Sequence, residues 1–317
     1  MKTNQLKENL ENYLIDLDDL AKSKNTINNY KATIKRFINY LESNKVNDLN
    51  QRNINTIMKM YRRYLNDNKL KASTRNRYLN DTILFLAKQG LNIEIEIPKN
   101  NNNNKKIKYL TSEEIQEVIN TIPLSNTIEK TKLRDKAIIL TLFKTGLRVS
   151  ELSNLKKQCL NLDSKEELIA IEVRAGKGEK DRTTYIDQDT LKLINEMIQQ
   201  RTKEFKQNEN DNDYLFTSIT GTQLKERAIQ KIIKNLAIST DKRLKEDNNK
   251  TIEKDYYKNK LTPHTLRHSL AIYLINEKNI PLNIVQKILG HSNIATTNIY
   301  TEIDNKETKK AMLKVWK

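Results

Sequence analysis

Six polar residues of this chain have side chains that suit chemistry on a phosphodiester, and four of them stand within its last 54 residues. They are Arg148, Lys177, His264, Arg267, His291 and Tyr300. A metal-free cut that can be resealed needs a nucleophile whose covalent link keeps the bond energy. Tyrosine suits this role, because an aryl oxide attacks well and also leaves easily. Since the free phenol has a pKa of about 10, a base or cationic surroundings must assist it.

The reaction makes two further demands. Charge that builds up on the phosphorus oxygens needs fixed donors, and the planar fork of an arginine provides two of them at once. One such donor commonly contributes about 3–4 kcal/mol in the transition state. The departing 5′ oxygen needs a proton from a nearby acid. The set of residues therefore indicates phosphodiester cleavage and resealing.

Two of these residues also have an ordinary structural explanation. His264 and Arg267 follow Pro263, so on the first turn of a helix they share a face, where a capping histidine and a surface arginine are common. His264 and His268 have the i, i+4 spacing of a zinc site. However, no acidic residue stands beside His264, and only one other histidine exists in the chain. We therefore expect neither a metal nor a cofactor.

The remaining candidates are equally weak when taken singly. His291 follows Gly290, which is expected to end a helix, and a histidine just past a helix end often only balances the helix dipole. A single tyrosine such as Tyr300 is far more often a core residue than a nucleophile. Arg148 alone is consistent with an ordinary surface residue, and Lys177 alone with the tip of a hairpin. Their joint presence, in this order, favours the chemical interpretation.

The composition indicates a polyanionic partner. The net charge is +17 and the pI is near 9.6, and clustered Lys and Arg neutralise phosphates and release counterions. The chain has 43 Lys against 14 Arg, with abundant Asn and Ile, which also fits the coding bias of an AT-rich genome. Charge therefore supports nucleic-acid binding without proving it.

Cysteine usage and hydropathy bear on the compartment. Cys159 is the single cysteine, which excludes an internal disulfide and fits a reducing environment. The chain has no apolar run of signal-peptide or membrane-spanning length. We therefore expect a cytoplasmic, nucleoid-associated protein without a membrane partner.

The elements that must position these residues divide into two parts. Residues 1–92 have apolar residues at helical spacing in four stretches, so we expect four amphipathic helices in one small domain. In the second stretch Thr26 precedes the first apolar residue and is expected to be the N-cap. Gly90 should end the fourth helix.

This first part is strongly basic. Through Asn92 it has 17 Lys and Arg against 9 Asp and Glu, a net charge of +8. A group of bases crowds its second half: Arg62, Arg63, Lys69, Lys71, Arg75 and Arg77. Solvated helix faces would explain them, but beside the phosphodiester chemistry we favour a surface that contacts DNA.

A linker is expected between the two parts. Residues 93–108 contain Pro98, five consecutive Asn and several Lys. Such a composition cannot form a core, so we expect a flexible basic linker and the domain boundary there.

The second part, residues 109–317, mixes helices with a small sheet. Residues 111–114 (TSEE) resemble a helix start, and a buried helix is expected around 137–144. Residues 168–173 and 182–186 should form two strands around a polar turn. Residues 239–260 are almost wholly charged or polar and predict an exposed insertion. The fold class is therefore mainly α with a small β-hairpin (α+β).

Five segments, in this order, resemble the tyrosine recombinases, also called phage-integrase-type or Xer-like site-specific recombinases. The segments are 145–152 (TGLRVSEL), 176–182 (GKGEKDR), 264–268 (HTLRH), 289–292 (LGHS) and Tyr300. They cover residues 109–317, which would be the catalytic domain of that family. Residues 1–92 are similar, on helix count and pattern, to its SAM-like core-binding domain.

The resemblance implies a specific reaction. Tyr300 would attack the scissile phosphate, form a 3′-phosphotyrosine and free a 5′ hydroxyl. Arg148 and Arg267 would clamp the non-bridging oxygens, and His291 would add a hydrogen bond there. The 5′ hydroxyl of a partner duplex would then attack, so that strands exchange through a Holliday junction without ATP or metal.

The same resemblance assigns three supporting roles. His264 would assist proton removal from Tyr300. Lys177, on the hairpin tip, would be the general acid for the leaving oxygen. Glu151 would support the catalytic residues without contacting the phosphate itself.

The resemblance also implies partners. Double-stranded DNA with paired inverted-repeat core sites would lie in a C-shaped clamp of the two domains. A homotetramer, with a dimer on each site, would exchange C-terminal helices, and accessory proteins are possible. Met312, Val315 and Trp316 give the last helix an apolar edge for that exchange, although docking of this tail on its own domain stays open.

Two other functions also stay open: a type IB topoisomerase-like relaxation of DNA, and a non-catalytic DNA-binding module.

Overall fold

The chain folds into two compact units, as a computed structural model shows. The structure describes residues 1–98, 107–124, 129–174, 181–204, 213–247 and 253–290. Contacts between Cα atoms divide the chain into one unit over Met1–Lys105 and a second over Lys106–Lys317. Each unit has its own hydrophobic core.

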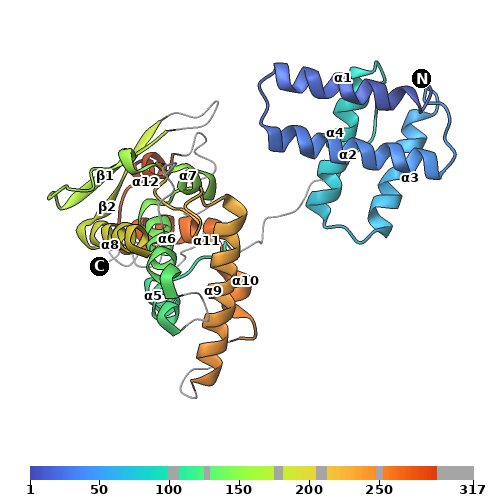
Figure 1. Cartoon of the computed structure of the whole chain (residues 1–317). Coiled ribbons are helices and arrows are strands. Elements are labelled where there is room, and N and C mark those ends of the chain that lie inside the picture. Colours follow the sequence, from blue (N-terminus) through green and yellow to red (C-terminus); the bar gives the residue numbers. More distant parts are fainter. Residues whose placement is uncertain (99–106, 125–128, 175–180, 205–212, 248–252, 291–317) are drawn as a thin grey trace, which may run out of the picture. The chain divides into compact units, whose positions relative to one another are not determined.

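Four helices build the first unit: α1 (Gln5–Asp19), α2 (Lys24–Ser43), α3 (Ile54–Asp67) and α4 (Ala72–Lys88). The helices α1 and α2 lie side by side, and α4 packs against both α2 and α3 (Figure 1). Their apolar stripes meet in a core whose largest fully buried side chains include Tyr61, Phe37 and Phe85. The expectation of four amphipathic helices is confirmed.

The start of α2 differs from the prediction. The helix begins at Lys24, and the cap is Ser23, whose hydroxyl accepts the backbone N–H of Thr26 at 3.2 Å. Thr26, the predicted cap, stands at the third helical position. Ser23 has the extended backbone that an N-cap requires, with φ −67° and ψ 148°. The prediction was therefore wrong by one turn.

The segment after α4 packs on the first unit. Ile93, Ile95 and Ile97 are partly buried against its core, while the residues between them are exposed. The side chains of α3 and α4 hold its backbone: Arg62 Nη1 donates to the Glu96 carbonyl at 2.9 Å. Residues 93–98 were expected to begin a flexible linker, but this alternation of apolar and polar residues lets one face of an extended segment bury its side chains.

The second unit is mainly helical. Its α-helices are α5 (Ser112–Thr121), α6 (Lys132–Thr145), α7 (Val149–Asn154), α8 (Gln188–Glu204), α9 (Glu226–Glu246), α10 (Tyr256–Lys260), α11 (Pro263–Ile272) and α12 (Leu282–Leu289). Short 3-10 turns occur at Ile122–Leu124, Glu129–Thr131 and Lys157–Cys159, and α11 continues as a π-helix over Tyr273–Glu277. The predicted helix start at residues 111–114 is confirmed, and it is a capping box, because Thr111 and Glu114 exchange side-chain-to-backbone hydrogen bonds.

Two strands complete this unit. The strands β1 (Leu168–Val173) and β2 (Arg182–Asp187) pair antiparallel, with Ile169 opposite Ile186. Alternate residues of β1 are buried, so one face of the hairpin packs on the core. The hairpin lies beside α8 and α12 (Figure 1). A mainly helical fold with a small antiparallel sheet is thus confirmed.

The helix α6 lies at the centre of the second unit. Ile138, Ile139 and Leu142 are fully buried, and α8 and α11 pack against the helix. It ends at Gly146, whose φ of +62° is a left-handed conformation that glycine adopts without strain. This buried helix therefore fixes where the following turn, with Arg148, leaves the core.

The stretch 239–260 was expected to be an exposed insertion, but where the structure describes it, it is partly buried. Its first residues continue α9, in which Thr240 and Leu244 are buried. Tyr257 of α10 is buried as well, and its backbone N–H donates to Asp241 Oδ1 at 2.9 Å. The expectation was wrong because two apolar residues of this stretch, Leu244 and Tyr257, are buried in the core.

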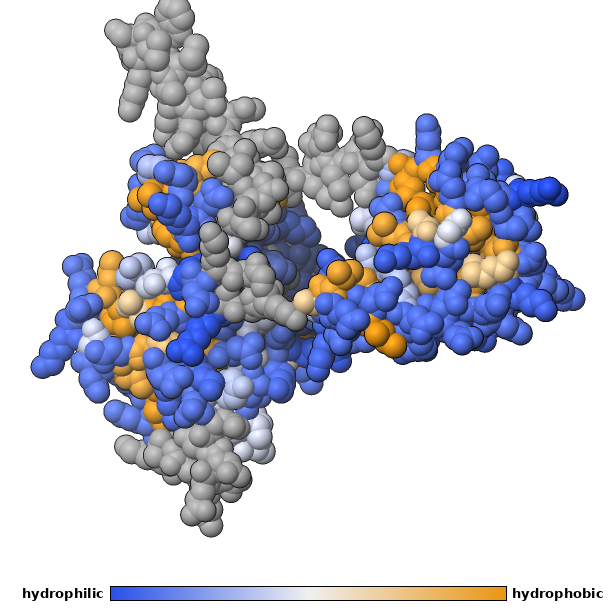
Figure 2. Space-filling model, turned by 90° about the horizontal axis from the view of Figure 1, so that it is seen from above, coloured by the Kyte–Doolittle hydropathy of each residue, from blue (hydrophilic) through white to orange (hydrophobic). Residues whose placement is uncertain are grey.

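The face of the molecule in Figure 2 is mainly hydrophilic. On the face that Figure 2 shows, hydrophobic residues gather in separate groups between polar ones. Within the described ranges, no helix combines the length and the apolar character needed to cross a bilayer.

Candidate active site

The start of α11 presents two of the predicted site residues. Thr262 caps the helix by accepting the backbone N–H of Thr265 at 3.0 Å, and Pro263 occupies its first turn. His264 is exposed on that turn, whereas Arg267, one turn later, is only 4% exposed. The helix therefore offers an imidazole to solvent and holds a guanidinium inside.

Arg267 joins two turns that are far apart in the sequence. Its Nη1 donates to the Gly146 carbonyl at 2.5 Å, and its Nη2 donates to the Leu289 carbonyl at 2.6 Å. Gly146 lies two residues before Arg148, and Leu289 lies two residues before His291. One buried arginine thus fixes the ends of α6 and α12 relative to α11.

Close packing at Gly146 makes this junction possible. A Cβ atom added there would lie 2.6 Å from Leu289 Cδ2 and 3.0 Å from Leu270 Cδ2. Both distances are shorter than ordinary contacts between carbon atoms. Only a glycine therefore lets the end of α6 approach α11 and α12 this closely.

Arg148 stands at the N-cap position of α7 and pairs with Glu151. Its backbone N–H donates to Glu151 Oε2 at 2.7 Å, and its Nη1 donates to Glu151 Oε1 at 3.1 Å. The side chain of Arg148 is 28% exposed, and that of Glu151 is 9% exposed. The carboxylate thus holds Arg148 from the protein side and leaves part of it at the surface.

Glu151 has a second arginine partner that the sequence did not single out as a site residue. Arg182, the first residue of β2, donates from Nη1 to Oε1 at 2.6 Å and from Nη2 to Oε2 at 2.7 Å. Burial alone would raise the pKa of Glu151, but the hydrogen bonds and charges of Arg182 and Arg148 outweigh it, so the pKa is lowered. The only sequence signal for Arg182 was its place at the end of the 176–182 segment.

His268 is the other histidine of α11 that the structure describes. It is half-buried, and burial, followed by the charges of His264 and Arg267, lowers its pKa to about 4. His268 is therefore neutral at neutral pH. Among the described residues, no group of His, Cys, Asp and Glu side chains forms a metal site.

Three of the six predicted catalytic residues lie outside the described ranges: Lys177, His291 and Tyr300. The same is true of Met312, Val315 and Trp316, on which the predicted exchange of C-terminal helices depends. The structure therefore brings Arg267 to the turn of Arg148 and to the end of α12, from which the chain continues to His291.

The six bases predicted to contact DNA lie near the turn between α3 and α4 of the first unit. Arg63, Lys69, Lys71 and Arg77 are exposed, and Arg75 is partly exposed. Arg62 is also partly exposed, and its bond to the Glu96 carbonyl gives it a structural role. In the described part of the chain, none of the six forms an ion pair with a carboxylate. Arg77 acts electrostatically on the Asp81 carboxylate without a short ion pair, so the charges of these bases are directed mainly to the surface.

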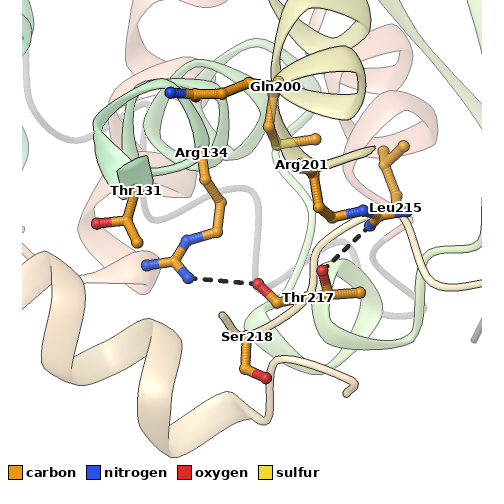
Figure 3. Close-up of a pocket in the computed structure, with 8 residues that line it drawn as sticks. Thr131, Arg134, Gln200, Arg201, Leu215, Thr217 and Ser218 are labelled. Atoms are coloured by element: carbon orange, nitrogen blue, oxygen red, sulfur yellow. Dashed lines mark hydrogen bonds between the residues drawn. The ribbon is translucent and has the colours of Figure 1, made fainter. Parts of the chain in front are cut away.

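A small cavity of the second unit lies at the opposite end of α6 from Arg148. Arg134 and Arg201 line it, and both bind Thr217: Arg134 donates to its carbonyl at 3.3 Å and Arg201 to its hydroxyl at 3.1 Å (Figure 3). The 14 residues of α6 span about 21 Å. This cavity is therefore remote from the Arg148 turn, and the chain itself provides acceptors for its arginines.

Comparisons with known proteins identify the family. The chain matches the phage integrase family over residues 108–307 and the N-terminal SAM-like domain of phage integrases over residues 10–97. Tyrosine recombinase XerA of Pyrococcus furiosus is 32% identical over 318 residues, which cover 96% of this chain and 93% of that protein. Tyrosine recombinase XerD of Staphylococcus saprophyticus is 29% identical over 296 residues, or 91% of each chain.

A solved structure agrees in fold. The Tn1549 transposon integrase, in complex with transposon right end DNA, has a TM-score of 0.70 at 18% identity and matches over 99% of each chain. The chain therefore belongs to the phage integrase family. It is a tyrosine recombinase, and its class of activity is site-specific recombination.

Proposed function

We propose that this protein cuts and rejoins DNA through a covalent bond between Tyr300 and a 3′ phosphate. The observation that carries the proposal is the position of Arg267. It binds the carbonyl of Gly146, ahead of Arg148, and the carbonyl of Leu289, ahead of His291. Arg267 thereby lies beside the turn that leads to Arg148 and beside the end of α12, which precedes His291 in the sequence, and this supports a common phosphate site for the three residues.

The reaction proceeds in two balanced steps. In the first, the phenol oxygen of Tyr300 attacks phosphorus, the bond to the 5′ oxygen breaks, and a proton from Lys177 reaches that oxygen. In the second, the 5′ hydroxyl of a partner strand attacks the phosphotyrosine and releases the phenol. Bond energy is conserved in the phosphotyrosine, so the exchange needs no ATP. The arginines take the charge-stabilising role that a metal ion would otherwise have, and exchange of one pair of strands gives a Holliday junction.

The remaining residues stabilise charge or move protons. Arg148 and Arg267 face the non-bridging oxygens, and His291 adds a hydrogen bond to them. His264 is exposed at the start of α11, and in this proposal it accepts the proton of the reacting tyrosine. Glu151 holds Arg148 in place through two hydrogen bonds.

The substrate in this proposal is double-stranded DNA with paired inverted-repeat core sites. The exposed bases between α3 and α4 support it, because their charges are available for phosphates. The Tn1549 integrase, which has the same fold, was solved with DNA. Four copies would act together, two on each site, with the apolar edge of Met312, Val315 and Trp316 docked on a neighbour. The cytoplasm, at the nucleoid, is the compartment where such a substrate is met.

A covalent-capture experiment tests the chemistry and finds the target sequence at the same time. The full chain is incubated with nicked fragments of genomic DNA from its source, denatured, and recovered with any DNA that stays attached. We expect sequences that share inverted repeats, linked through a 3′ end. Tyr300→Phe should remove the link, whereas Tyr185→Phe, a change at an exposed residue of β2, should preserve it. A link that survives Tyr300→Phe would contradict the proposal.

A plasmid assay then separates recombination from DNA relaxation. A supercoiled plasmid with two captured sites should yield recombinants with the wild-type chain. Relaxed plasmid without any recombinant would instead assign the chain a topoisomerase-like activity. Binding without either product would assign it a non-catalytic role.

A further inference from the structure

Arg182 makes a bidentate ion pair with the carboxylate that holds Arg148. Its two Nη atoms donate to the two oxygens of Glu151 at 2.6 Å and 2.7 Å. Both side chains are 9% exposed. The pair joins residues 31 positions apart, from the start of α7 and the start of β2. Such a fork-to-carboxylate arrangement fixes both partners in geometry as well as in charge.

The charges of this cluster do not cancel. Arg148 and Arg182 each have one positive charge and both pair with Glu151, so these three side chains together have a net charge of +1. Arg182 is the more deeply buried of the two arginines, at 9% against 28% exposed. It therefore balances the carboxylate from inside, while Arg148 stands closer to the surface.

Arg182 also contacts the end of α12. A Cβ atom added at Gly290 would lie 2.6 Å from Arg182 Cδ and 3.0 Å from its Nε. Gly290 has a φ of +69° and immediately precedes His291. The Nε of Arg182 is buried, and within the described residues it has no hydrogen-bond partner. The orientation of this guanidinium thus follows from Glu151 and from its packing on Gly290.

We propose that Arg182 is a positioning residue of the recombinase site: it neutralises Glu151, so that Arg148 keeps its charge for the scissile phosphate, and it supports the Gly290 turn. This inference rests on the proposed function. Without Arg182, the cluster would have a net charge of zero, and Glu151 would repel the phosphate that Arg148 attracts. Two unit charges several ångströms apart near a protein surface interact strongly enough to change a rate by about 10- to 100-fold.

Rescue by a second substitution tests this charge role. The rate of covalent complex formation is measured at saturating captured DNA for the wild type, Arg182→Gln, Glu151→Gln and the double variant. We expect Arg182→Gln to be about 10- to 100-fold slower than the wild type. The double variant again has a net charge of +1, so it should be at least roughly 5-fold faster than Arg182→Gln. Arg182→Lys, which keeps the charge, should lie between the wild type and Arg182→Gln.

A purely structural role would give a different pattern. The double variant, which lacks both partners of the pair, would then cleave no faster than Arg182→Gln. This result would overturn the proposal. Arg243→Gln is the matched control, because Arg243 also pairs with a carboxylate of the same unit, Glu117. It should lower the melting temperature without slowing cleavage.

A measurement without catalysis keeps the test independent. In an NMR titration with labelled glutamate, the pKa of Glu151 should rise from its lowered value in Arg182→Gln and not in Arg243→Gln. An unchanged pKa would also overturn the proposal. If the wild-type chain forms no covalent complex, the proposed function fails, whereas a wild type that cleaves without the predicted rescue contradicts only the role of Arg182.

Discussion

The two units of this chain use arginine and lysine in opposite ways. In the first unit the candidate bases lie at the surface, and Arg63, Lys69, Lys71 and Arg77 are exposed. In the second unit Arg267 is 4% exposed and donates to two backbone carbonyls. The first arrangement suits contacts that attract phosphates in any register, and the second suits one phosphate held in a fixed place.

This difference shows what burial adds to a positive charge. An exposed lysine is screened by salt and gains little from a single partner. A buried guanidinium is fixed before the substrate arrives, so its charge costs no reorganisation during the reaction. The units should therefore respond differently to the same kinds of substitution.

The largest effect is expected at Arg267. Arg267→Ala removes a fixed cation and leaves the carbonyls of Gly146 and Leu289 without this donor, so we expect cleavage at saturating DNA to fall by about 10²- to 10³-fold. DNA affinity should change much less, because many other phosphate contacts remain. In the first unit, Arg77→Ala should weaken binding and leave the rate at saturation unchanged. If Arg267→Ala lost affinity and rate by the same factor, Arg267 would serve mainly to bind DNA. It would then not differ in role from the exposed bases of the first unit.

A glycine pair compares the packing of the two units. Gly146→Ala combines a left-handed φ of +62° with a contact of 2.6 Å to Leu289, so we expect a loss of unfolding free energy of about 2–4 kcal/mol. Gly90→Ala, after α4, has a similar φ of +78° but nothing within 4 Å, and should cost about 1 kcal/mol. Chemical denaturation measures both. Equal losses would show that strain alone, and not close packing, requires Gly146.

The exposed bases of the first unit should set the salt dependence of binding. If Lys69 and Lys71 each contact a phosphate, their joint replacement by Gln lowers the slope of log affinity against log salt by about 1–2 and weakens binding about tenfold. Titrations of labelled DNA at several salt concentrations measure this. Replacing Lys7 and Lys31, which pair with Glu42 and Glu11 elsewhere in the unit, is the matched control. An unchanged slope in the Lys69 and Lys71 variant would remove this turn from the DNA surface.

The smallest effect is expected from His268. Its pKa is about 4 in the folded chain and about 6.5 when unfolded, so between these values only the unfolded state binds the proton. The contribution of neutral His268 to the free energy of unfolding is therefore fully present above pH 6.5, and it is lost as the pH falls toward 4. Allowing for solvent at a half-buried site, we expect about 1 kcal/mol less stability at pH 5 than at pH 7 from this residue. His268→Asn should lose that pH dependence in a denaturation series.

Much of the fold could be predicted from local patterns. The apolar spacing of α1 and α2, the capping box at Thr111 and the alternation in β1 all depend on neighbours in the sequence. The alternation of Ile93, Ile95 and Ile97 was equally local, but the run of asparagines after it concealed the signal. The burial of Leu244 and Tyr257 within the stretch 239–260 was missed because the composition of this stretch is mainly polar.

The site was predictable only in part. The types and order of the six candidate residues, from Arg148 to Tyr300, predict phosphate chemistry only when they are taken together. The role of Arg182 was not predictable, because a strand residue at a hairpin edge has no signature that distinguishes a buried ion pair from a solvated charge. Its partner Glu151 lies 31 residues away and becomes its neighbour only when β2 packs near α7.

The sequence by itself thus determined which side chains are present for chemistry: a tyrosine, two arginines, two histidines and a lysine, the types that we expect for phosphodiester exchange. Only the tertiary structure decided how the arginines are held. Arg267 is fixed by carbonyls 121 and 22 residues away, and a carbonyl is the same at every position of the chain. No sequence pattern therefore marks the two carbonyls that accept hydrogen bonds from Arg267. These carbonyls lie beside Arg267 only because α6, α11 and α12 pack together.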